Sequence, residues 1–367
     1  MKIAIVGCGQ LARMLALKGW TFNATFSFIA EGGEATDCVE GLGTIVHVKQ
    51  GMTAAQVYND IGRPDVITVE REQVSVELLR ELMAFCLVYP HPDVIAICQD
   101  RLAEKHALHE HGIPVAGYLP ASNKQEILLA AETFGYPLFF KSRQQGYDGK
   151  NQWRIDSSEM LQKMLPVISK HVCVAEQAVD FTAEVSVIAV RGRDEKTAFY
   201  PLTENRHHNG ILVSSVAPAD KRYPGVYEQA VQFLQILLQS WNYTGVLSME
   251  LFVTPEKVLV NELAPRVHNS GHWSMNAAVT CQFENHLRAI AGLAIGSTQV
   301  QSYCGMVNLL TVPDNSSSLF DKNSHVYWYN KVPKPNRKLG HVNICGDEYQ
   351  DAKEYVSVLA ARLYPLL

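Results

Sequence analysis

Two glutamates on neighbouring strands are the strongest chemical feature of this sequence. Residues 248–264, SMELFVTPEKVLVNELA, are two apolar runs joined by a short turn at 255–257, which predicts a β-hairpin. Pairing across this hairpin sets Glu250 opposite Glu262 on one sheet face, where two like charges repel unless a cation lies between them. Carboxylates on rigid strands suit magnesium, which keeps several waters and usually completes its shell with substrate phosphates. The alternative is a solvated sheet face with two ordinary surface acids.

The segment after this hairpin is dense in groups that bind anions or donate hydrogen bonds. Arg266 can hold a carboxylate or a phosphate through two parallel hydrogen bonds, and His268 and Asn269 supply directional donors. Each of these residues alone is more simply explained as a satisfied surface polar group. Together, directly after a pair of acids, they predict an active site.

A polar loop with two glycines gives a first nucleotide signal. Residues 144–151, QQGYDGKN, follow an expected strand at 137–141, and Lys141 and Arg143 lie just before them. The backbone N–H groups of such a loop can lie against a triphosphate, and its closure would exclude water from a reactive intermediate. A surface turn is the alternative, because Tyr-Asp-Gly is good turn chemistry.

The first residues carry a competing nucleotide signal. Residues 7–12, GCGQLA, fit the loose dinucleotide fingerprint between a strand and a helix, and Glu31 follows the next strand where an acid would bind an NAD ribose. An NAD-dependent oxidoreductase is therefore an alternative function. The fingerprint does not decide the matter, since glycine at a strand-to-helix turn is needed for backbone geometry whatever the turn binds. The same helix N-terminus also suits a ribose phosphate.

The composition is that of a globular enzyme with more than one domain. The 367 residues are 47% hydrophobic and 19% charged, and this length favours two or three domains. The formal net charge of −5 gives no general positive field, which argues against nucleic-acid binding. Eight cysteines without a CxxC motif, no signal peptide and no apolar run of about 18 residues predict a cytoplasmic protein with reduced thiols and no membrane segment.

The expected elements divide the chain into three units. Residues 1–98 alternate apolar strands with helices, which predicts an open, Rossmann-like α/β sheet. Residues 99–180 form a smaller unit that begins with a helix from Gln99. Residues 181–367 turn strand-rich, so the C-terminal part has α+β character, and three short strands between 306 and 344 close the chain. These three ranges are the predicted domains.

A basic pair, Arg337 and Lys338, precedes the last expected strand and is called the basic tail here. Read together, the loop, the hairpin and this basic tail resemble the ATP-grasp ligases, and within them the 5-(carboxyamino)imidazole ribonucleotide synthase family of purine biosynthesis. The resemblance spans nearly the whole chain, and its most specific motif is NELAPRVHNSGHWS at 261–274. The other motifs are GCGQLARM at 7–14, QDRLAEKHALHEHGIP at 99–114, GYDGKNQ at 146–152, VAEQAVDFTAEVSV at 174–187, YPLTENRHHNGIL at 200–212, SMELF at 248–252 and RKLGHVNI at 337–344. The fold that this resemblance implies is an ATP-grasp fold with an N-terminal Rossmann-like pre-ATP-grasp domain.

The resemblance implies a carboxylating ligase. In this reaction ATP phosphorylates bicarbonate to carboxyphosphate, 5-aminoimidazole ribonucleotide captures the carboxyl group, and ADP and phosphate are released. Phosphoryl transfer depends on charge neutralisation and positioning more than on an acid–base pair, which fits the residues above. The implied cofactor is Mg²⁺ with ATP as co-substrate, and the implied assembly is a homodimer that binds neither nucleic acid nor membrane.

The resemblance also implies a role for each matching residue. Glu250 and Glu262 would hold magnesium. The catalytic residues would be Arg266, His268, Asn269 and Tyr147. The residues expected to bind ATP are Arg101, Lys141, Gly146, Tyr147, Asp148, Gly149, Lys150, Asn151, Gln152, Glu176, Gln177, Ala178, Val179, Glu184, His207, Asn261 and Glu262. The residues expected to bind the ribonucleotide are Gly9, Gln10, Leu11 and, at its 5′-phosphate, Arg337 and Lys338.

Some positions depart from the family pattern. Ala12 stands where the family usually has Gly, and Lys150-Asn151 stands where it has Arg-Gly, which changes the loop's closed geometry. Val213 replaces a frequent Arg and weakens any anion contact there. Other ATP-grasp ligases, such as a formate-using transformylase or a biotin-type carboxylase, share the nucleotide site and stay open. A non-catalytic nucleotide-binding scaffold stays open as well.

Overall fold

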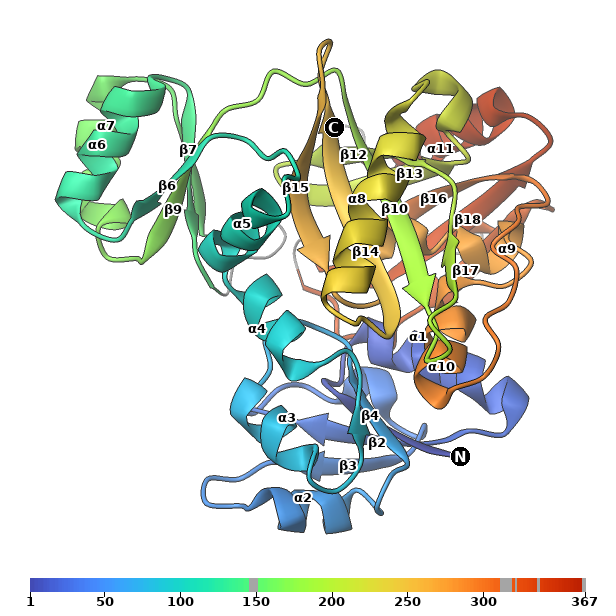
Figure 1. Ribbon diagram of the computed structural model, residues 1–367. Helices are drawn as coiled ribbons and strands as arrows, with labels where there is room; N and C mark the ends of the chain where they lie inside the picture. The colour runs from blue at the N-terminus through green and yellow to red at the C-terminus, as the bar shows by residue number, and fades with distance from the viewer. Residues whose placement is uncertain (145–150, 311–318, 321, 335–336, 365–367) are drawn as a thin grey trace.

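Three β-sheets, taken from successive parts of the chain, make up the protein (Figure 1). The structure is a computed structural model that describes residues 1–144, 151–310, 319–320, 322–334 and 337–364. The N-terminal sheet, in blue, lies below the large C-terminal sheet, and the small central sheet stands apart at one side (Figure 1). In these described residues no helix has both the length and the apolar character needed to cross a membrane.

The first sheet is parallel, with strand order β3-β2-β1-β4-β5. Its strands are β1 (Lys2–Val6), β2 (Thr25–Ala30), β3 (Thr44–His47), β4 (Val66–Val69) and β5 (Leu87–Val88). The helices of this part are α1 (Gln10–Gly19), α2 (Ala54–Asp60), α3 (Val76–Leu82) and α4 (Pro92–Gln99). Strand β1 is apolar without alternation and almost entirely buried, as expected for a parallel strand covered on both faces.

The second sheet is small and antiparallel, with order β6-β9-β7-β8. It is made of β6 (Tyr118–Ala121), β7 (Leu138–Ser142), β8 (Gln152–Ile155) and β9 (Cys173–Gln177), with α6 (Lys124–Phe134) and α7 (Ser158–Ile168) against it. Helix α5 (Arg101–Glu110) leads into this unit. The unit has a hydrophobic core of its own. It is tied to the third sheet where Val260 N donates to Pro114 O at 2.8 Å.

The third sheet has nine strands, eight of them in the order β15-β14-β10-β12-β13-β16-β18-β17, with β11 paired to β10. The strands are β10 (Ala183–Arg191), β11 (Thr197–Phe199), β12 (Thr203–His208), β13 (Ile211–Ala217), β14 (Gly245–Val253), β15 (Val258–Ala264), β16 (Tyr303–Leu309), β17 (Ser324–Trp328) and β18 (Gly340–Gly346). The helices are α8 (Val226–Ser240), α9 (Ser274–Ala277), α10 (Gln282–Ala291) and α11 (Tyr349–Leu363). Gly305 on β16 lets α11 approach closely, because a Cβ there would lie 2.1 Å from Val356 Cγ2.

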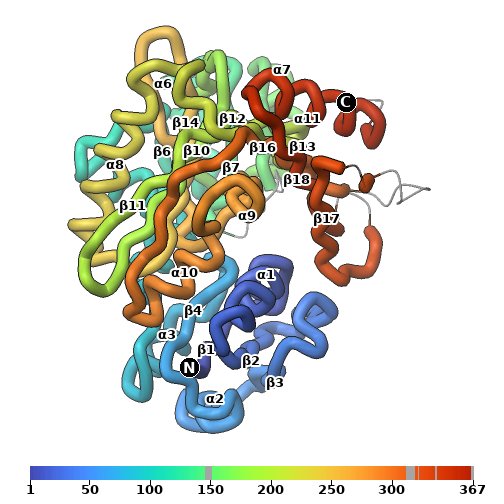
Figure 2. The backbone as a smooth tube through the Cα atoms, turned by 90° about the vertical axis from the view of Figure 1, so that its right-hand side faces the viewer, coloured from blue at the N-terminus to red at the C-terminus, as the bar shows by residue number. Residues whose placement is uncertain are grey.

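The first and third sheets share one hydrophobic core, which runs from Ile3 and Phe28 to Val246 and Trp273. Buried His286 on α10 joins them: one ring nitrogen lies 2.8 Å from Thr68 Oγ1 and the other accepts from Val246 N at 3.1 Å. Strand β17 and the segment after it lie near α1, seen from the side in Figure 2. The domain limits at 98/99 and 180/181 stay a prediction.

Three elements differ from the expectations. The helix expected from Gln99 begins at Arg101, because the Asp100 side chain caps it by accepting from Leu102 N and Ala103 N, and Gln99 instead ends α4. Strand β12 was not expected. Helix α11 follows the last strand, and its buried residues Ala352, Val356, Leu359 and Ala360 recur at helical spacing, which is a sequence signal for that helix.

Candidate active site

One large cavity lies where the three sheets meet. Its volume is about 1370 Å³, and residues from every sheet line it. Gln10 and Glu72 come from the first part of the chain, Lys141 and Glu176 from the small sheet, and Glu250 from the third sheet. The cavity therefore exists only when these three parts are packed together.

Glu250 and Glu262 are paired across β14 and β15, as the hairpin predicted. They have different neighbours: Arg101 Nη1 lies 3.0 Å from Glu262 Oε2, whereas His268 Nε2 lies 3.5 Å from Glu250 Oε1. Burial, reinforced by the charge of Glu262, raises the pKa of Glu250 to about 7. Burial also acts on Glu262, but Arg101 and Lys141 outweigh it and lower the pKa of that carboxyl. The charge of His207 opposes the rise of the Glu250 pKa only in part, so a divalent cation would complete the neutralisation of the pair.

A β-bulge at Asn261 brings a third oxygen to this pair. The register shifts between Glu250, which pairs with Glu262, and Leu251, which pairs with Val260, so Asn261 is the extra residue of β15. Both Asn261 and Glu262 therefore line the cavity, although successive strand residues normally face opposite ways. Asn261 Oδ1 is buried without a hydrogen-bond partner among the described residues. Two carboxylates and a free amide oxygen are donors that fit magnesium.

A buried cluster of charges forms the neighbouring wall. Glu176 Oε2 lies 2.9 Å from Lys141 Nζ and 3.3 Å from Lys105 Nζ. Burial alone would raise the pKa of Glu176, but Lys105 and Lys141 lower it to about 2. Burial lowers the pKa of Lys141 in spite of Glu176. Lys141 lines the cavity and Lys105 lies behind Glu176, so the single carboxylate offsets the positive charge of this cluster only in part.

Arg266 is held by an acid from the first part of the chain. Its Nε lies 2.8 Å from Glu72 Oε1, its Nη2 donates to Glu72 Oε2 at 3.1 Å, and its Nη1 donates to Val267 O at 3.0 Å. The ion pair with Glu72 and the hydrogen bonds to Glu72 and Val267 O fix the guanidinium at the cavity wall.

His268 presents an N–H group to the cavity. Asn205 donates to Ser186 Oγ and Ser186 donates to Ser270 Oγ, so the Ser270 hydroxyl is left to donate to His268 Nδ1 at 2.9 Å. The Ser270 backbone N–H donates to the same nitrogen. Burial and nearby cations, Arg266 first among them, hold the pKa of His268 well below its usual range. The neutral ring therefore carries its proton on Nε2, on the side of Glu250.

Two other expected site residues already have partners. Asn269 and Asn308 exchange both amide hydrogen bonds, at 3.0 and 2.7 Å, so the Asn269 amide is fixed in orientation. His207 Nδ1 lies 3.0 Å from Glu184 Oε2. Burial would lower the pKa of His207, but its hydrogen bond to the Glu184 carboxylate and the charge of Glu250 raise it to about 8. His207 is therefore mostly protonated at neutral pH.

The glycine turn at the N-terminus binds an internal carboxylate. Glu70 accepts from Gly9 N at 2.7 Å, Ala12 N at 3.1 Å and Leu11 N at 3.2 Å. A Cβ on Gly9 would lie 2.5 Å from Glu70 Oε1, so the glycine is needed for this approach. Glu31, the expected ribose ligand of an NAD enzyme, accepts from Ser75 N instead. An acid of the protein thus lies against the helix N-terminus where a dinucleotide phosphate would bind, whereas the assignment of Gly9, Gln10 and Leu11 to the ribonucleotide stays a prediction.

The basic tail is only partly in the cavity. Lys338 lines it, whereas Arg337 is absent from its wall and donates to Val332 O at 3.0 Å. Lys331, which sequence reasoning did not select, donates to Gln10 Oε1 and ties the tail to α1. The assignment of Arg337 and Lys338 to a phosphate stays a prediction.

The cavity gathers most of the predicted site residues. Those that line it are Gln10, Leu11, Arg101, Lys141, Asn151, Gln152, Glu176, Gln177, Val179, Glu184, His207, Glu250, Asn261, Glu262, Arg266, His268, Asn269 and Lys338. Those outside its wall are Gly9, Ala178 and Arg337. Those outside the described residues are Gly146, Tyr147, Asp148, Gly149 and Lys150.

Sequence reasoning missed Glu72, Lys105 and Glu104. Glu104 lines the cavity and accepts from Leu263 N at 3.1 Å, and burial raises its pKa to about 8. Helical spacing could have indicated Glu104, because it lies four residues before buried Leu108 and so on the inner face of α5. Glu72 gives no such local signal.

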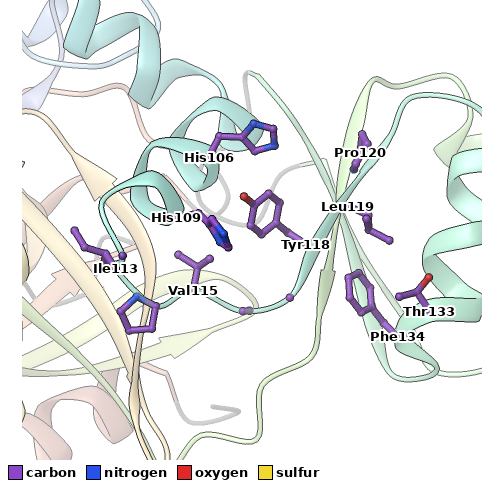
Figure 3. Close-up of a pocket in the computed structure, with 13 residues that line it drawn as sticks. His106, His109, Ile113, Val115, Tyr118, Leu119, Pro120, Thr133 and Phe134 are labelled. Atoms are coloured by element: carbon purple, nitrogen blue, oxygen red, sulfur yellow. The ribbon is translucent and has the colours of Figure 1, made fainter.

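A second cavity, of about 780 Å³, lies between α5 and the small sheet. Figure 3 shows His106 and His109 on one side and Phe134 on the other, with Tyr118 between them. None of the predicted site residues lines it.

Family models match three consecutive parts of the chain. Residues 1–99 match a ribonucleotide synthetase pre-ATP-grasp domain, residues 106–283 match an ATP-grasp domain, and residues 304–355 match a phosphoribosylaminoimidazole carboxylase C-terminal domain.

Named relatives match over nearly the full length. N5-carboxyaminoimidazole ribonucleotide synthase of Vibrio vulnificus is 37% identical, covering 98% of this chain and 95% of the relative. The crystal structure of N5-carboxyaminoimidazole ribonucleotide synthetase from Thermus thermophilus has a TM-score of 0.89 at 36% identity and covers 98% of both chains. That of N5-carboxyaminoimidazole synthase from Aspergillus clavatus, in complex with ADP and 5-aminoimidazole ribonucleotide, has a TM-score of 0.87 at 25% identity, again over 98% of both chains.

Proposed function

Because the chain belongs to the N5-carboxyaminoimidazole ribonucleotide synthase family of ATP-grasp enzymes, we propose that it carboxylates 5-aminoimidazole ribonucleotide with bicarbonate and ATP. The product is N5-carboxyaminoimidazole ribonucleotide, the compound called 5-(carboxyamino)imidazole ribonucleotide above, made in purine biosynthesis. The ATP-grasp fold with a pre-ATP-grasp domain, which the sequence resemblance implied, is confirmed. The observation that carries the reaction is the pair Glu250–Glu262 beside Arg266 and buried Lys141 in one cavity.

The reaction has two steps whose atoms balance. A bicarbonate oxygen attacks the γ-phosphorus of ATP and ADP leaves, which gives carboxyphosphate. The amine nitrogen of the ribonucleotide then attacks the carboxyl carbon, phosphate leaves and the nitrogen loses a proton. Both steps concentrate negative charge, so the site must neutralise charge and orient the reactants.

Glu250, Glu262 and Asn261 would hold magnesium, which when bound supplies positive charge to the ATP phosphates. Lys141 and Arg101 reach the same part of the cavity from the small sheet and from α5, and they would bind the phosphates directly. Glu176 orients Lys141 by its hydrogen bond at 2.9 Å.

The other end of the cavity would hold bicarbonate and the amine. Arg266 is held in position by Glu72 and can grip a carboxylate with its guanidinium. His268 is neutral with its proton on Nε2, so it donates a hydrogen bond to an oxyanion rather than accepting a proton. The hydrogen bonds with Asn308 fix the Asn269 amide, so Asn269 would meet the reactants without having to reorient first. Lys338 lines the cavity as the candidate for the ribonucleotide phosphate.

Phosphate release from ATP tests the proposal. We expect release in carbon-dioxide-depleted buffer with magnesium to need both bicarbonate and 5-aminoimidazole ribonucleotide. Release that follows formate instead of bicarbonate would indicate another ATP-grasp ligase, and no release with all substrates would refute the assignment.

A matched pair of hairpin variants tests the metal site. Glu262→Gln should abolish nearly all turnover, whereas Glu256→Gln, in the exposed turn of the same hairpin, should keep it. Equal turnover in the two variants would remove the metal pair from the mechanism. We also propose a cytoplasmic homodimer, from the family resemblance, and sedimentation of the purified protein tests the oligomeric part.

A further inference from the structure

Two cysteines are direct partners on neighbouring strands of the third sheet. Cys304 on β16 pairs with Cys345 on β18, and these strands lie side by side in Figure 1. The Cys345 N–H donates to Asn323 O, on the β17 side, at 3.1 Å. The N–H and C=O of one strand residue point to the same side, so Cys304 and Cys345 form a non-hydrogen-bonded pair. At such pairs the Cα atoms lie about 4.5 Å apart, which is within the range of disulfides.

The two sulfurs differ in chemistry. The Cys304 thiol, which donates to Gly305 O at 3.6 Å, and the Ser302 side chain lower the pKa of Cys345 to about 7 against the effect of burial. Cys304 is fully buried, and burial holds the pKa of its thiol well above its usual range. Cys345 is only partly buried. The pair therefore combines an accessible thiolate with a protonated thiol beside it, the arrangement of an attacking and a resolving cysteine.

Other cysteines lack this combination. Cys86 is about as exposed as Cys345, but burial raises its pKa to about 11. Cys281 is buried in the same hydrophobic cluster as Cys304, yet it lies at the N-cap of α10 and not opposite Cys304 on a paired strand. These two residues supply the controls.

We propose that Cys304 and Cys345 form a reversible disulfide when the protein meets a peroxide. The Cys345 thiolate attacks one peroxide oxygen, the O–O bond breaks, the sulfur becomes a sulfenic acid, and hydroxide leaves. The Cys304 sulfur then attacks the Cys345 sulfur to form the S–S bond, and the thiol proton leaves with the sulfenic hydroxyl as water. A dithiol reductant returns both thiols and is itself oxidised to a disulfide.

Peroxide treatment of the native full-length protein, followed by thiol counting after unfolding in denaturant, tests this proposal. After hydrogen peroxide, two of the eight cysteines should become resistant to alkylation, and peptide mapping should find Cys304 joined to Cys345. Dithiothreitol should restore both thiols. Peroxide treatment that leaves all thiols titratable, or a cross-link that joins other cysteines such as Cys281, would overturn the proposal.

Variants separate the two roles. Cys345→Ser should lose no thiol to peroxide, whereas Cys304→Ser should stop at a Cys345 sulfenic acid that dimedone traps. Cys86→Ser, the control of similar exposure, should form the disulfide as the unchanged protein does. If Cys304→Ser does not fold, Cys345→Ser still decides, because its partly exposed site tolerates the change. Thiol loss in Cys345→Ser equal to that in Cys86→Ser would refute the attacking role.

Discussion

Glu176→Gln removes the charge that holds two buried lysines together. The Glu176, Lys141 and Lys105 side chains are 4%, 10% and 2% exposed, so solvent cannot replace the lost carboxylate. Glutamine keeps the size and an acceptor oxygen, so the change is one of charge. The two ammonium groups are left facing each other with no acid between them.

The structure gives a magnitude for this loss. The lowering of the Glu176 pKa from 4.5 to about 2 corresponds to about 3 kcal/mol of stability at neutral pH. Removing one partner of a buried ion pair typically costs about 3 to 5 kcal/mol. With about 2.1 cal/mol/K of unfolding entropy per residue, the melting temperature should fall by about 4 to 6 °C if the whole chain unfolds in one transition.

Thermal unfolding of matched variants is the assay. The control is Glu159→Gln, because Glu159 pairs with Lys163 on the surface at 79% exposure and should contribute no more than about 0.5 kcal/mol. The depressed pKa of Glu176 means that its contribution is complete above pH 4.5 and is lost as the pH falls towards about 2. The gap between the unchanged protein and Glu176→Gln should therefore narrow in acid. A fall no larger than that of Glu159→Gln would refute the reasoning.

Three further predictions concern the rest of the molecule. Gly9→Ala should displace Glu70 from the helix amides and destabilise the protein by about 1 to 3 kcal/mol in urea unfolding, and unchanged stability would contradict the 2.5 Å approach. Lys338→Ala should raise KM for the ribonucleotide at least about tenfold and leave KM for ATP unchanged; equal changes in steady-state kinetics would place Lys338 elsewhere. Glu204 is half-buried, which alone would raise its pKa, but hydrogen bonds from Lys353 and neighbouring tyrosines lower it. Stability from Glu204 should be present above its ordinary pKa and lost as the pH falls through the lower folded value, so Glu204→Gln should flatten the acid side of a stability–pH curve.

Local sequence patterns predicted the pair of glutamates in the site. The Glu250–Glu262 pairing followed from strand alternation and turn chemistry within a single hairpin, and the structure confirms the register. The bulge at Asn261 did not follow, because the apolar pattern is the same with or without one extra residue. Helix α11 has buried residues at helical spacing, so it could have been predicted.

Contacts between distant parts of the chain could not be read from the sequence. Glu72 and Arg266 are 194 residues apart, and neither local sequence indicates the other. The glycine turn was ambiguous for a similar reason, since two glycines permit close approach by any anion. Only the fold shows that the anion is Glu70. Long-range packing thus decides which of several locally reasonable ligands each residue has.

The three-sided cavity has a consequence for how the protein loses activity. The first and third sheets share one hydrophobic core, whereas the small sheet has a core of its own and is tied to the third sheet by contacts such as Val260 with Pro114. Mild denaturant should therefore separate the small sheet and its helices from the rest of the protein before any sheet unfolds. Activity would then be lost before the circular dichroism changes. A preparation that keeps all of its secondary structure can therefore still be inactive.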